Sequence, residues 1–429
     1  MVDAFERIGE ELHYQQLSNG LTVYLVPKKG FHKTYACLTV RYGGADRSFV
    51  YGGRKYDTPM GIAHFLEHKM FDMPYGSALT RLSSNGASPN AYTASDETAY
   101  HFECTDKFKE NLDTLLEFVF TPYFTDESVS KEQGIISQEI LMTLDDPQHA
   151  LYRNFMKSVY SSHPVRDPVI GTLESIMQID ASTLELCHKL FYTPQNCVLT
   201  VVGDVEMQDI LESCEKHVPD SAGLLPARDY GPRESLVPSR TLIKDQMEVS
   251  MPLFLFGCGV KAAGRGESVL RQICTASYAT EIICGRMSRL YNALYSDGLI
   301  DKQFSAGLDM SADVSTIVFS GRSNDPEKVM LAVLAETETV ISRGVSGEEL
   351  SLLRRYLTGE SLSGLNYFSL IARQVADGHF YGYSPFGKFE ILDSISADEI
   401  ISFISENINK NRTALSVIAP TSSAKGGVQ

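Results

Sequence analysis

Two short sequence patterns each occur twice in this chain, and their spacing constrains the fold more than any single motif does. Leu173–Ile176 (LESI) is matched by Leu392–Ile395 (LDSI), and Leu199–Val202 (LTVV) by Leu415–Ile418 (LSVI). The copies are 219 and 216 residues apart, counted from 173 to 392 and from 199 to 415, and they keep their order. In a chain of 429 residues, patterns that recur after 216 to 219 residues indicate two related domains of similar size.

Turn-forming residues divide the chain near its middle, where Pro219 to Ser239 is rich in Pro, Gly and Ser. We therefore predict an N-terminal domain over residues 1–220, a linker over 221–240 and a homologous C-terminal domain over 241–420. Residues 421–429 form a small polar tail that we expect to be disordered. Strand-like and helix-like segments alternate without regular βαβ units, which favours an α+β fold with a largely antiparallel sheet packed with helices in each domain.

Local patterns predict several elements of the first domain. Asn19-Gly20 is a hairpin turn signal, and the apolar runs 22–26 and 35–40 after it are predicted to be antiparallel strands. Further strands are expected at 89–93 and 98–104, and helices at 77–84, 108–120 and 125–143.

The segment Gly61–Phe71 reads GIAHFLEHKMF, and as a helix it places His64 and His68 one turn apart with Glu67 beside them. Two imidazoles at this spacing can chelate one zinc ion and leave room for a third protein ligand and a water molecule. A glutamate next to the second histidine can take the proton of that water. The order His-x-x-Glu-His is the inverzincin signature, the inverse of the thermolysin-type motif. The alternative is an ordinary helix with a polar exposed face.

The predicted helix 125–143 carries Glu132 and Glu139, seven residues apart and therefore on one face. Glu139 is a candidate third zinc ligand, and Glu132 is a candidate carboxylate that orients a ligand. Glutamates are common on exposed helix faces, so spacing alone leaves the solvated alternative open. In the second half, the equivalent of the histidine helix falls near residue 282, where Ile282–Met287 contains no histidine, and we expect one metal site per chain.

Composition argues against several classes of partner. The net charge of −16 repels nucleic-acid backbones and anionic membrane surfaces. The chain has no apolar stretch of the roughly 20 residues that span a bilayer, and its first residues lack a signal-peptide pattern. The eight cysteines are scattered without a Cys-x-x-Cys pair, which is typical of reduced thiols. We expect a cytoplasmic protein with neither nucleic-acid nor membrane partners.

Several ordered features together resemble one family, the pitrilysin/insulinase-type zinc metallopeptidases. They are GIAHFLEH at 61–68, the strand Asn90–Thr93, the helix with Glu132–Ile140, and the duplicated domains. The chain is most similar to the half-size bacterial members, in particular to a group associated with elongation factor P modification. The resemblance implies an endopeptidase or processing peptidase that acts on short or unfolded peptides.

Carried over residue by residue, the resemblance implies that His64, His68 and Glu139 bind Zn²⁺ and that Glu67 is the general base. It also implies that Glu132 is the family's additional acidic residue. Asn90 and Ala91 match a strand edge that pairs with the backbone of an extended peptide substrate.

The chain departs from the family pattern in its second domain, where active members carry an Arg and, shortly after it, a Tyr that assist the substrate carbonyl. Here Tyr295 corresponds to the Arg and Asp301 to the Tyr. In half-size members two chains can form one chamber, so the resemblance implies a heterodimer in which a homologous partner supplies Arg and Tyr; a homodimer is the other arrangement. A non-catalytic peptide-binding or scaffold subunit of the same fold is the alternative function.

Overall fold

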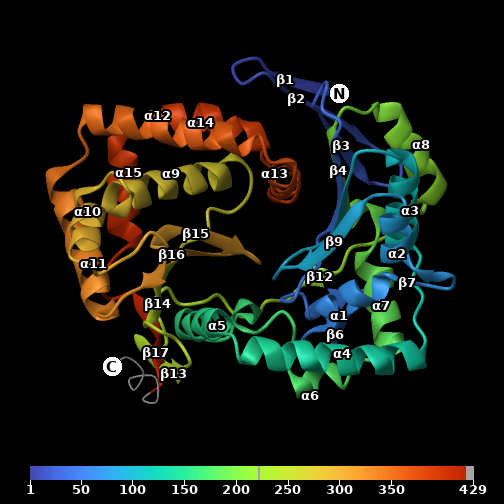
Figure 1. Ribbon diagram of the computed structural model, residues 1–429, viewed down its shortest axis with the longest axis horizontal. Helices are drawn as coiled ribbons and strands as arrows, with labels where there is room; N and C mark the ends of the chain where they lie inside the picture. Colours follow the sequence, from blue (N-terminus) through green and yellow to red (C-terminus); the bar gives the residue numbers. More distant parts are fainter. Residues whose placement is uncertain (221–222, 422–429) are drawn as a thin grey trace, which may run out of the picture. The chain divides into compact units, whose positions relative to one another are not determined.

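The computed structural model describes residues 1–220 and 223–421, which form two compact units (Figure 1). Unit 1 contains residues 1–140, 168–230 and 362–386, and unit 2 contains 141–167, 231–361 and the described residues from 387 onward. The predicted tail lies outside the described residues except for Thr421, as do positions 221 and 222 of the predicted linker. Among the described residues, no helix has the length and apolar character that a membrane span requires.

Unit 1 is built on a seven-stranded sheet with the order β1-β2-β3-β11-β4-β10-β9. The strands are β1 (Val2–Phe5), β2 (Glu10–Gln16), β3 (Thr22–Pro27), β4 (Thr34–Val40), β9 (Ser88–Thr93), β10 (Thr98–Cys104) and β11 (Cys197–Gly203). All neighbouring strands are antiparallel except β3 and β11, which are parallel.

The predicted Asn19-Gly20 turn joins β2 to β3, and the apolar runs 22–26 and 35–40 form β3 and β4. These two strands run in opposite directions, but they do not pair, because β11 lies between them. Every residue of β4 and β11 is buried, so both strands lie in the middle of the core and not at an edge.

Helices cover both faces of this sheet (Figure 1). They are α1 (Ile62–Met70), α2 (Ala78–Ser84), α3 (Phe108–Phe120), the first part of α4 (Asp126–Leu144), α6 (Leu173–Ile176), α7 (Ala181–Phe191), α8 (Met207–His217) and α13 (Phe368–Tyr381). The helices predicted at 77–84, 108–120 and 125–143 are confirmed to within one residue at each end. Short pairings add β5 (Ser48–Tyr51), β6 (Arg54–Asp57) and β12 (Ala227–Arg228), and β7 (Asp72–Met73) with β8 (Gly76–Ser77).

Unit 2 contains a five-stranded sheet with the order β13-β17-β14-β16-β15. Its strands are β13 (Leu242–Met247), β14 (Leu253–Val260), β15 (Ser305–Ser311), β16 (Val314–Arg322) and β17 (Ala414–Pro420). Its helices are α5 (Pro147–Val159), α9 (Glu267–Cys284), α10 (Arg289–Ser296), α11 (Pro326–Arg343), most of α12 (Gly347–Gly364), α14 (Lys388–Ser394) and α15 (Ala397–Asn407).

The two sheets share one plan. The order β13-β17-β14-β16-β15 repeats β3-β11-β4-β10-β9, with one parallel pair at the same place, β13 with β17. The recurring patterns fall at corresponding positions: LTVV lies in β11, and LSVI lies in β17. The predicted fold class is therefore confirmed as α+β with two homologous domains, each a largely antiparallel sheet packed with helices.

One helix from each half of the sequence completes the unit built mainly from the other half. α5 packs on β14 and β17 of unit 2, where Phe155 and Leu255 belong to one apolar cluster. α13 packs on β4 and β11 of unit 1, where Ala376 and Phe380 cover Val198. We refer to this reciprocal arrangement as the helix exchange.

Candidate metal centre

The start of α1 is fixed by a close approach of two backbone segments. Gly61 precedes α1 with a φ of +91°, a conformation that residues with a side chain rarely adopt. A Cβ on Gly61 would lie 2.7 Å from the carbonyl oxygen of Ile170. The Ser175 hydroxyl also donates a hydrogen bond of 2.7 Å to the carbonyl of Met60. The loop before α6, together with Ser175 in α6 itself, therefore sets where α1 begins.

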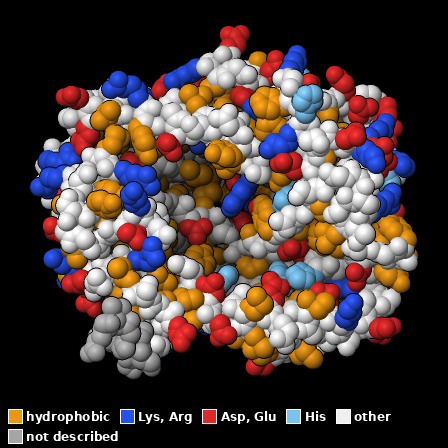
Figure 2. Space-filling view, in the orientation of Figure 1, with side chains coloured by type: hydrophobic (Ala, Val, Ile, Leu, Met, Phe, Trp, Pro, Cys, Tyr) orange, Lys and Arg blue, Asp and Glu red, His pale blue; other side chains and the backbone are white. Residues whose placement is uncertain are grey.

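α1 separates its apolar residues from its histidines. Its buried apolar residues, which anchor the helix in the core, are Ile62, Ala63, Phe65, Leu66 and Met70. His64 and His68 lie on the remaining face and are partly exposed, while Glu67 is buried. Figure 2 shows histidine side chains at the surface over α1, next to carboxylates. The sequence prediction of a helix presenting both imidazoles on one face is confirmed.

α4 brings the two glutamates to the same place. Thr125 and Ser128 cap its start, each side chain accepting a hydrogen bond of 3.2 Å from the other's backbone N–H. The apolar stripe Val129, Ile136 and Ile140 is buried and sets the rotation of the helix. That rotation turns Glu132 and Glu139 toward α1.

His64, His68 and Glu139 converge on one point. The Nε2 atom of His64 lies 3.7 Å from Glu139 Oε1, and Nε2 of His68 lies 3.6 Å from Glu139 Oε2. These distances are too long for good hydrogen bonds, but they are close to the roughly 3.3–3.5 Å that separates ligand atoms around a tetrahedral zinc ion with bonds of about 2.0–2.2 Å. Within the described part of the chain, these three residues are the one group whose ligand atoms gather closely enough to hold a metal.

Glu132 holds the second histidine. Its Oε1 atom lies 2.9 Å from His68 Nδ1, and its side chain is only 13% exposed. Burial lowers the pKa of His68, but the hydrogen bond to Glu132 and the surrounding carboxylates outweigh burial and raise the pKa above its usual value. With Nδ1 engaged by Glu132, Nε2 is the nitrogen that faces Glu139.

His64 has the opposite environment. Burial, with a further contribution from His68, lowers its pKa to about 3, so the ring is neutral at ordinary pH. Its Nδ1 atom is buried and has no hydrogen-bond partner among the described residues. A neutral imidazole has a lone pair to offer to a cation, so two imidazoles and one carboxylate fit the donor set of a zinc site with an open position.

Glu67 is held by a residue to which sequence reasoning gave no role. The Thr93 hydroxyl donates a hydrogen bond of 2.5 Å to Glu67 Oε2. Burial raises the pKa of Glu67, and the hydrogen bond from Thr93 and the neighbouring His68 oppose this only in part. In the sequence Thr93 is marked only as a strand residue, because the contact depends on how the end of β9 passes α1.

Asn90 and Ala91 lie on β9, the last strand of the unit 1 sheet. On its inner side β9 pairs with β10, and Ala91 is opposite Tyr100. The Ala91 N–H donates a hydrogen bond of 2.9 Å to the side chain of Asn90. No described strand pairs with the outer side of β9, so this edge has backbone groups available for an added strand.

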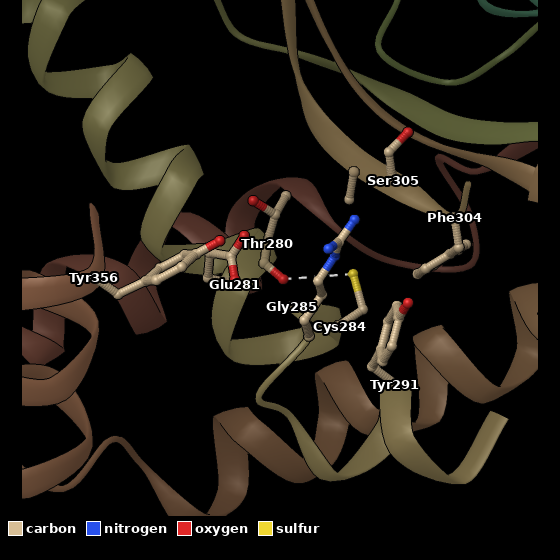
Figure 3. A pocket seen from close by; sticks show the side chains of 10 residues that line it. Thr280, Glu281, Cys284, Gly285, Tyr291, Phe304, Ser305 and Tyr356 are labelled. Carbon is tan, nitrogen blue, oxygen red and sulfur yellow. Dashed lines mark hydrogen bonds between the residues drawn. The ribbon is translucent and has the colours of Figure 1, made fainter. Parts of the chain in front are cut away.

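The corresponding region of unit 2 has a different chemistry. The end of α9 borders a pocket where Figure 3 shows Glu281, Cys284, Tyr291 and Tyr356 around the space. Cys284 is buried and donates to the carbonyl of Thr280. No histidine lines this pocket, and no group of potential metal ligands is found among the described residues of unit 2.

Tyr295 and Asp301, which stand where the family resemblance places Arg and Tyr, are engaged within unit 2. The Asp301 carboxylate accepts from Arg322, with Nη2 at 2.9 Å. Tyr295 is 44% exposed and its ring stacks with that of Tyr291, 6.1 Å away. Both side chains therefore have local structural roles.

Comparison with known proteins identifies the family. Residues 49–173 match the family model of insulinase (peptidase family M16), and residues 178–357 match the peptidase M16 inactive domain. A Bacillus subtilis protein named uncharacterized zinc protease YmfH is 34% identical, over 97% of this chain and 99% of its own length. The uncharacterized zinc protease ML0855 of Mycobacterium leprae is 27% identical over 86% of this chain and 84% of its own.

Solved structures agree. An M16-like peptidase from Alicyclobacillus acidocaldarius has a TM-score of 0.91 and 31% identity, covering 96% of this chain and 99% of that one. A Helicobacter pylori protease, with a TM-score of 0.80 and 20% identity over 96% of this chain and 100% of its own, shares the fold. The names of the relatives and the His-His-Glu group together support zinc as the metal. With both domains matched and a third of its residues identical to YmfH over nearly its whole length, this chain belongs to the insulinase family of peptidases, M16.

Proposed function

We propose that this chain is a zinc-dependent endopeptidase or processing peptidase that acts on short or unfolded peptides. The observation that carries the proposal is the convergence of His64, His68 and Glu139 on one point, with the buried Glu67 beside them. Relatives named zinc proteases support the peptidase activity.

In the proposed site His64, His68 and Glu139 would hold zinc, which when bound would acidify a water molecule and polarise the scissile carbonyl. The Glu67 carboxylate would take the proton of the attacking water and pass it to the leaving amine. Its raised pKa suits both steps, because a carboxylate with a very low pKa is a poor proton acceptor. Glu132 fixes the ring of His68.

We propose that the substrate binds as an added strand along the outer edge of β9, through backbone groups near Asn90 and Ala91. Support comes from the chain direction: β9 ends at Thr93, whose hydroxyl contacts Glu67. A peptide that pairs with β9 would therefore run toward the general base.

The chain is proposed to be the metal-bearing subunit of a two-chain chamber in the cytoplasm, and a homologous chain would supply the missing Arg and Tyr. Tyr295 and Asp301 support this. Tyr295 lacks the guanidinium of the Arg that it replaces, and Asp301 lacks the phenol of the Tyr that it replaces. A homodimer is the alternative assembly. Hydrolysis by the purified chain at the rate of a co-expressed pair would remove the reason to invoke a heterologous partner.

The test is a pair of measurements on each variant: zinc content, and cleavage of a fluorogenic peptide. Glu67→Gln should abolish hydrolysis with zinc still bound, because the amide cannot accept the proton. If zinc is lost together with activity, the role given to Glu67 is wrong. His64→Ala and Glu139→Ala should deplete zinc, and full stoichiometric zinc in Glu139→Ala would remove Glu139 from the ligand set.

A second function, a non-catalytic peptide-binding or scaffold subunit, is favoured by the replacement of the Arg and Tyr with Tyr295 and Asp301. It predicts bound zinc without hydrolysis both for the chain alone and for the co-expressed pair. Hydrolysis by the pair that disappears in Glu67→Gln would exclude it.

A further inference from the structure

A cavity of about 620 Å³ in unit 2 is unusual in its charge. It lies at the end of α5, between the turn that follows this helix, the segment leading into β13, and β13 itself. Its charged and hydroxyl-bearing lining residues are Lys157, Arg166, Arg240, Asp245, Ser161 and Ser239. Three positive side chains and one carboxylate face this space, although the whole chain has 54 acidic and 38 basic residues.

The positive charges of the cavity are largely uncompensated. The carboxylate of Asp245 accepts a hydrogen bond of 2.7 Å from the side-chain amide of Asn154. Arg166 donates to the carbonyl of Ser161. No described residue pairs with the ammonium of Lys157 or with the guanidinium of Arg240. Lys157 also stands in the last turn of α5, where a cation favours the helix dipole, but this accounts for only one of the three charges.

The walls of the cavity are held in place by hydrogen bonds that do not use these cations. Glu234 accepts hydrogen bonds from three successive backbone N–H groups, at 3.0 Å from Ser161 and at 2.6 Å from each of Ser162 and His163. The N–H of Ser239 donates to the carbonyl of Ser158 at 2.9 Å, which ties the segment before β13 to the end of α5. The backbone walls of the cavity are therefore preorganised, and a ligand would order only the unpaired side chains of Lys157 and Arg240.

These features together define a ligand class. We propose that the cavity binds a phosphate-bearing small molecule, with Lys157, Arg166 and Arg240 contacting the phosphate oxygens. A site with three cations is better matched by a phosphate group, which carries more than one negative charge, than by a ligand with a single carboxylate. Guanidinium groups also match the geometry of phosphate oxygens. The volume exceeds that of a free phosphate ion and lies within the usual range for small-molecule sites. No aromatic side chain lines the cavity, so nothing there would stack on a nucleobase.

The test is calorimetric titration of the full-length protein with pyrophosphate, at fixed ionic strength and without peptide substrate. The expected result is one site per chain, with affinity reduced at least about tenfold in Lys157→Ala/Arg240→Ala, because two of three charged contacts are lost. Neither side chain has a structural partner, so this variant should fold normally, which thermal unfolding will check. The single variant Arg240→Glu, at an exposed position, should abolish binding through charge reversal.

A matched control removes the same amount of charge elsewhere. Lys302→Ala/Lys410→Ala takes two exposed lysines from unit 2 outside the cavity and should leave affinity unchanged. Absence of pyrophosphate binding, or an equal loss in the control variant, would overturn the proposal, because the second result would reflect diffuse charge attraction. Equal displacement of pyrophosphate by succinate would overturn the choice of phosphate over carboxylate. The test does not depend on peptidase activity.

Discussion

The hydrogen bond between Glu132 and His68 gives a prediction that needs no substrate and no partner chain. In Glu132→Ala, the ring of His68 loses the acceptor that lies 2.9 Å from its Nδ1 atom. Glu132 is 13% exposed and His68 is 27% exposed, so water can replace the carboxylate only in part. A hydrogen bond to a charged group contributes about 1.5–3 kcal/mol, equivalent to about 10–150-fold in a binding constant. Removing comparable outer partners of metal ligands costs about 10–100-fold in affinity.

We therefore expect zinc affinity to fall by one to two orders of magnitude in Glu132→Ala, and by less in Glu132→Gln, which keeps an acceptor oxygen. The assay is competition with a chromophoric chelator, with circular dichroism to verify folding. Glu127→Ala is the matched control, because Glu127 lies on the same helix and is exposed. A change of less than about threefold in Glu132→Ala would refute the view that this carboxylate supports the metal site.

Three further predictions concern stability. Burial, helped by the charge of Asp377, raises the pKa of Glu97 to about 8, so the folded state binds a proton more tightly than the unfolded state. The thermal unfolding temperature should therefore fall as the pH rises from 5 to 9. The loss of stability from this group is at most about 1.4 kcal/mol per pH unit. Arg228→Met should lower the free energy of unfolding in urea by about 3–5 kcal/mol, because it leaves the carboxylate of Asp46, fully buried and 2.9 Å from Arg228 Nε, without its counter-charge. Gly61→Ala should cost about 1–3 kcal/mol in thermal unfolding through backbone strain at a φ of +91°, and should also weaken zinc binding by displacing α1.

Each of these has its own control. Glu97→Gln removes the titrating group and should flatten the pH dependence; an equally steep curve in this variant would assign the effect to another group. Arg54→Ala removes an exposed arginine from the same unit, and a loss as large as that of Arg228→Met would contradict the buried-charge argument. Gly52 has a φ of +58°, but an added Cβ there meets open space. The loss of stability in Gly52→Ala therefore measures backbone strain alone, without the collision with the carbonyl of Ile170 that is expected in Gly61→Ala. Zinc affinity that survives in Gly61→Ala would show that α1 is not displaced.

The sequence predicts the parts of the site that depend on local periodicity. Helical spacing alone places His64 and His68 on one face, and the same rule places Glu132 and Glu139 together on α4. The pairing of the two helices follows from the family resemblance, because spacing within one helix does not determine which face of another helix it meets. The contact between Thr93 and Glu67 could not be predicted, since it joins two elements through tertiary packing.

In the sheets, too, local patterns predict some features and tertiary packing decides the others. The four strands predicted at 22–26, 35–40, 89–93 and 98–104 follow from apolar runs and turn signals, and their bounds agree with those of β3, β4, β9 and β10 to within one residue. The position of β11 between β3 and β4 does not follow, because pairing with a strand more than 150 residues away leaves no mark on the local pattern. The duplication reduces the number of possible strand orders, because the five strands of the unit 2 sheet repeat the order of five strands in the unit 1 sheet.

The helix exchange has a consequence for the time course of synthesis. The last segment of unit 1, residues 362–386 with α13, is complete only after 386 of the 429 residues have been made, although the rest of the unit is complete at Tyr230. At about 5–20 residues per second, the intervening 156 residues, from 230 to 386, take roughly 8–30 s to translate. Throughout that interval the face of β11 that carries Val198 lacks its cover of Ala376 and Phe380. The nascent chain therefore has an extended period in which an apolar sheet face is open to water, before the metal-bearing unit is complete.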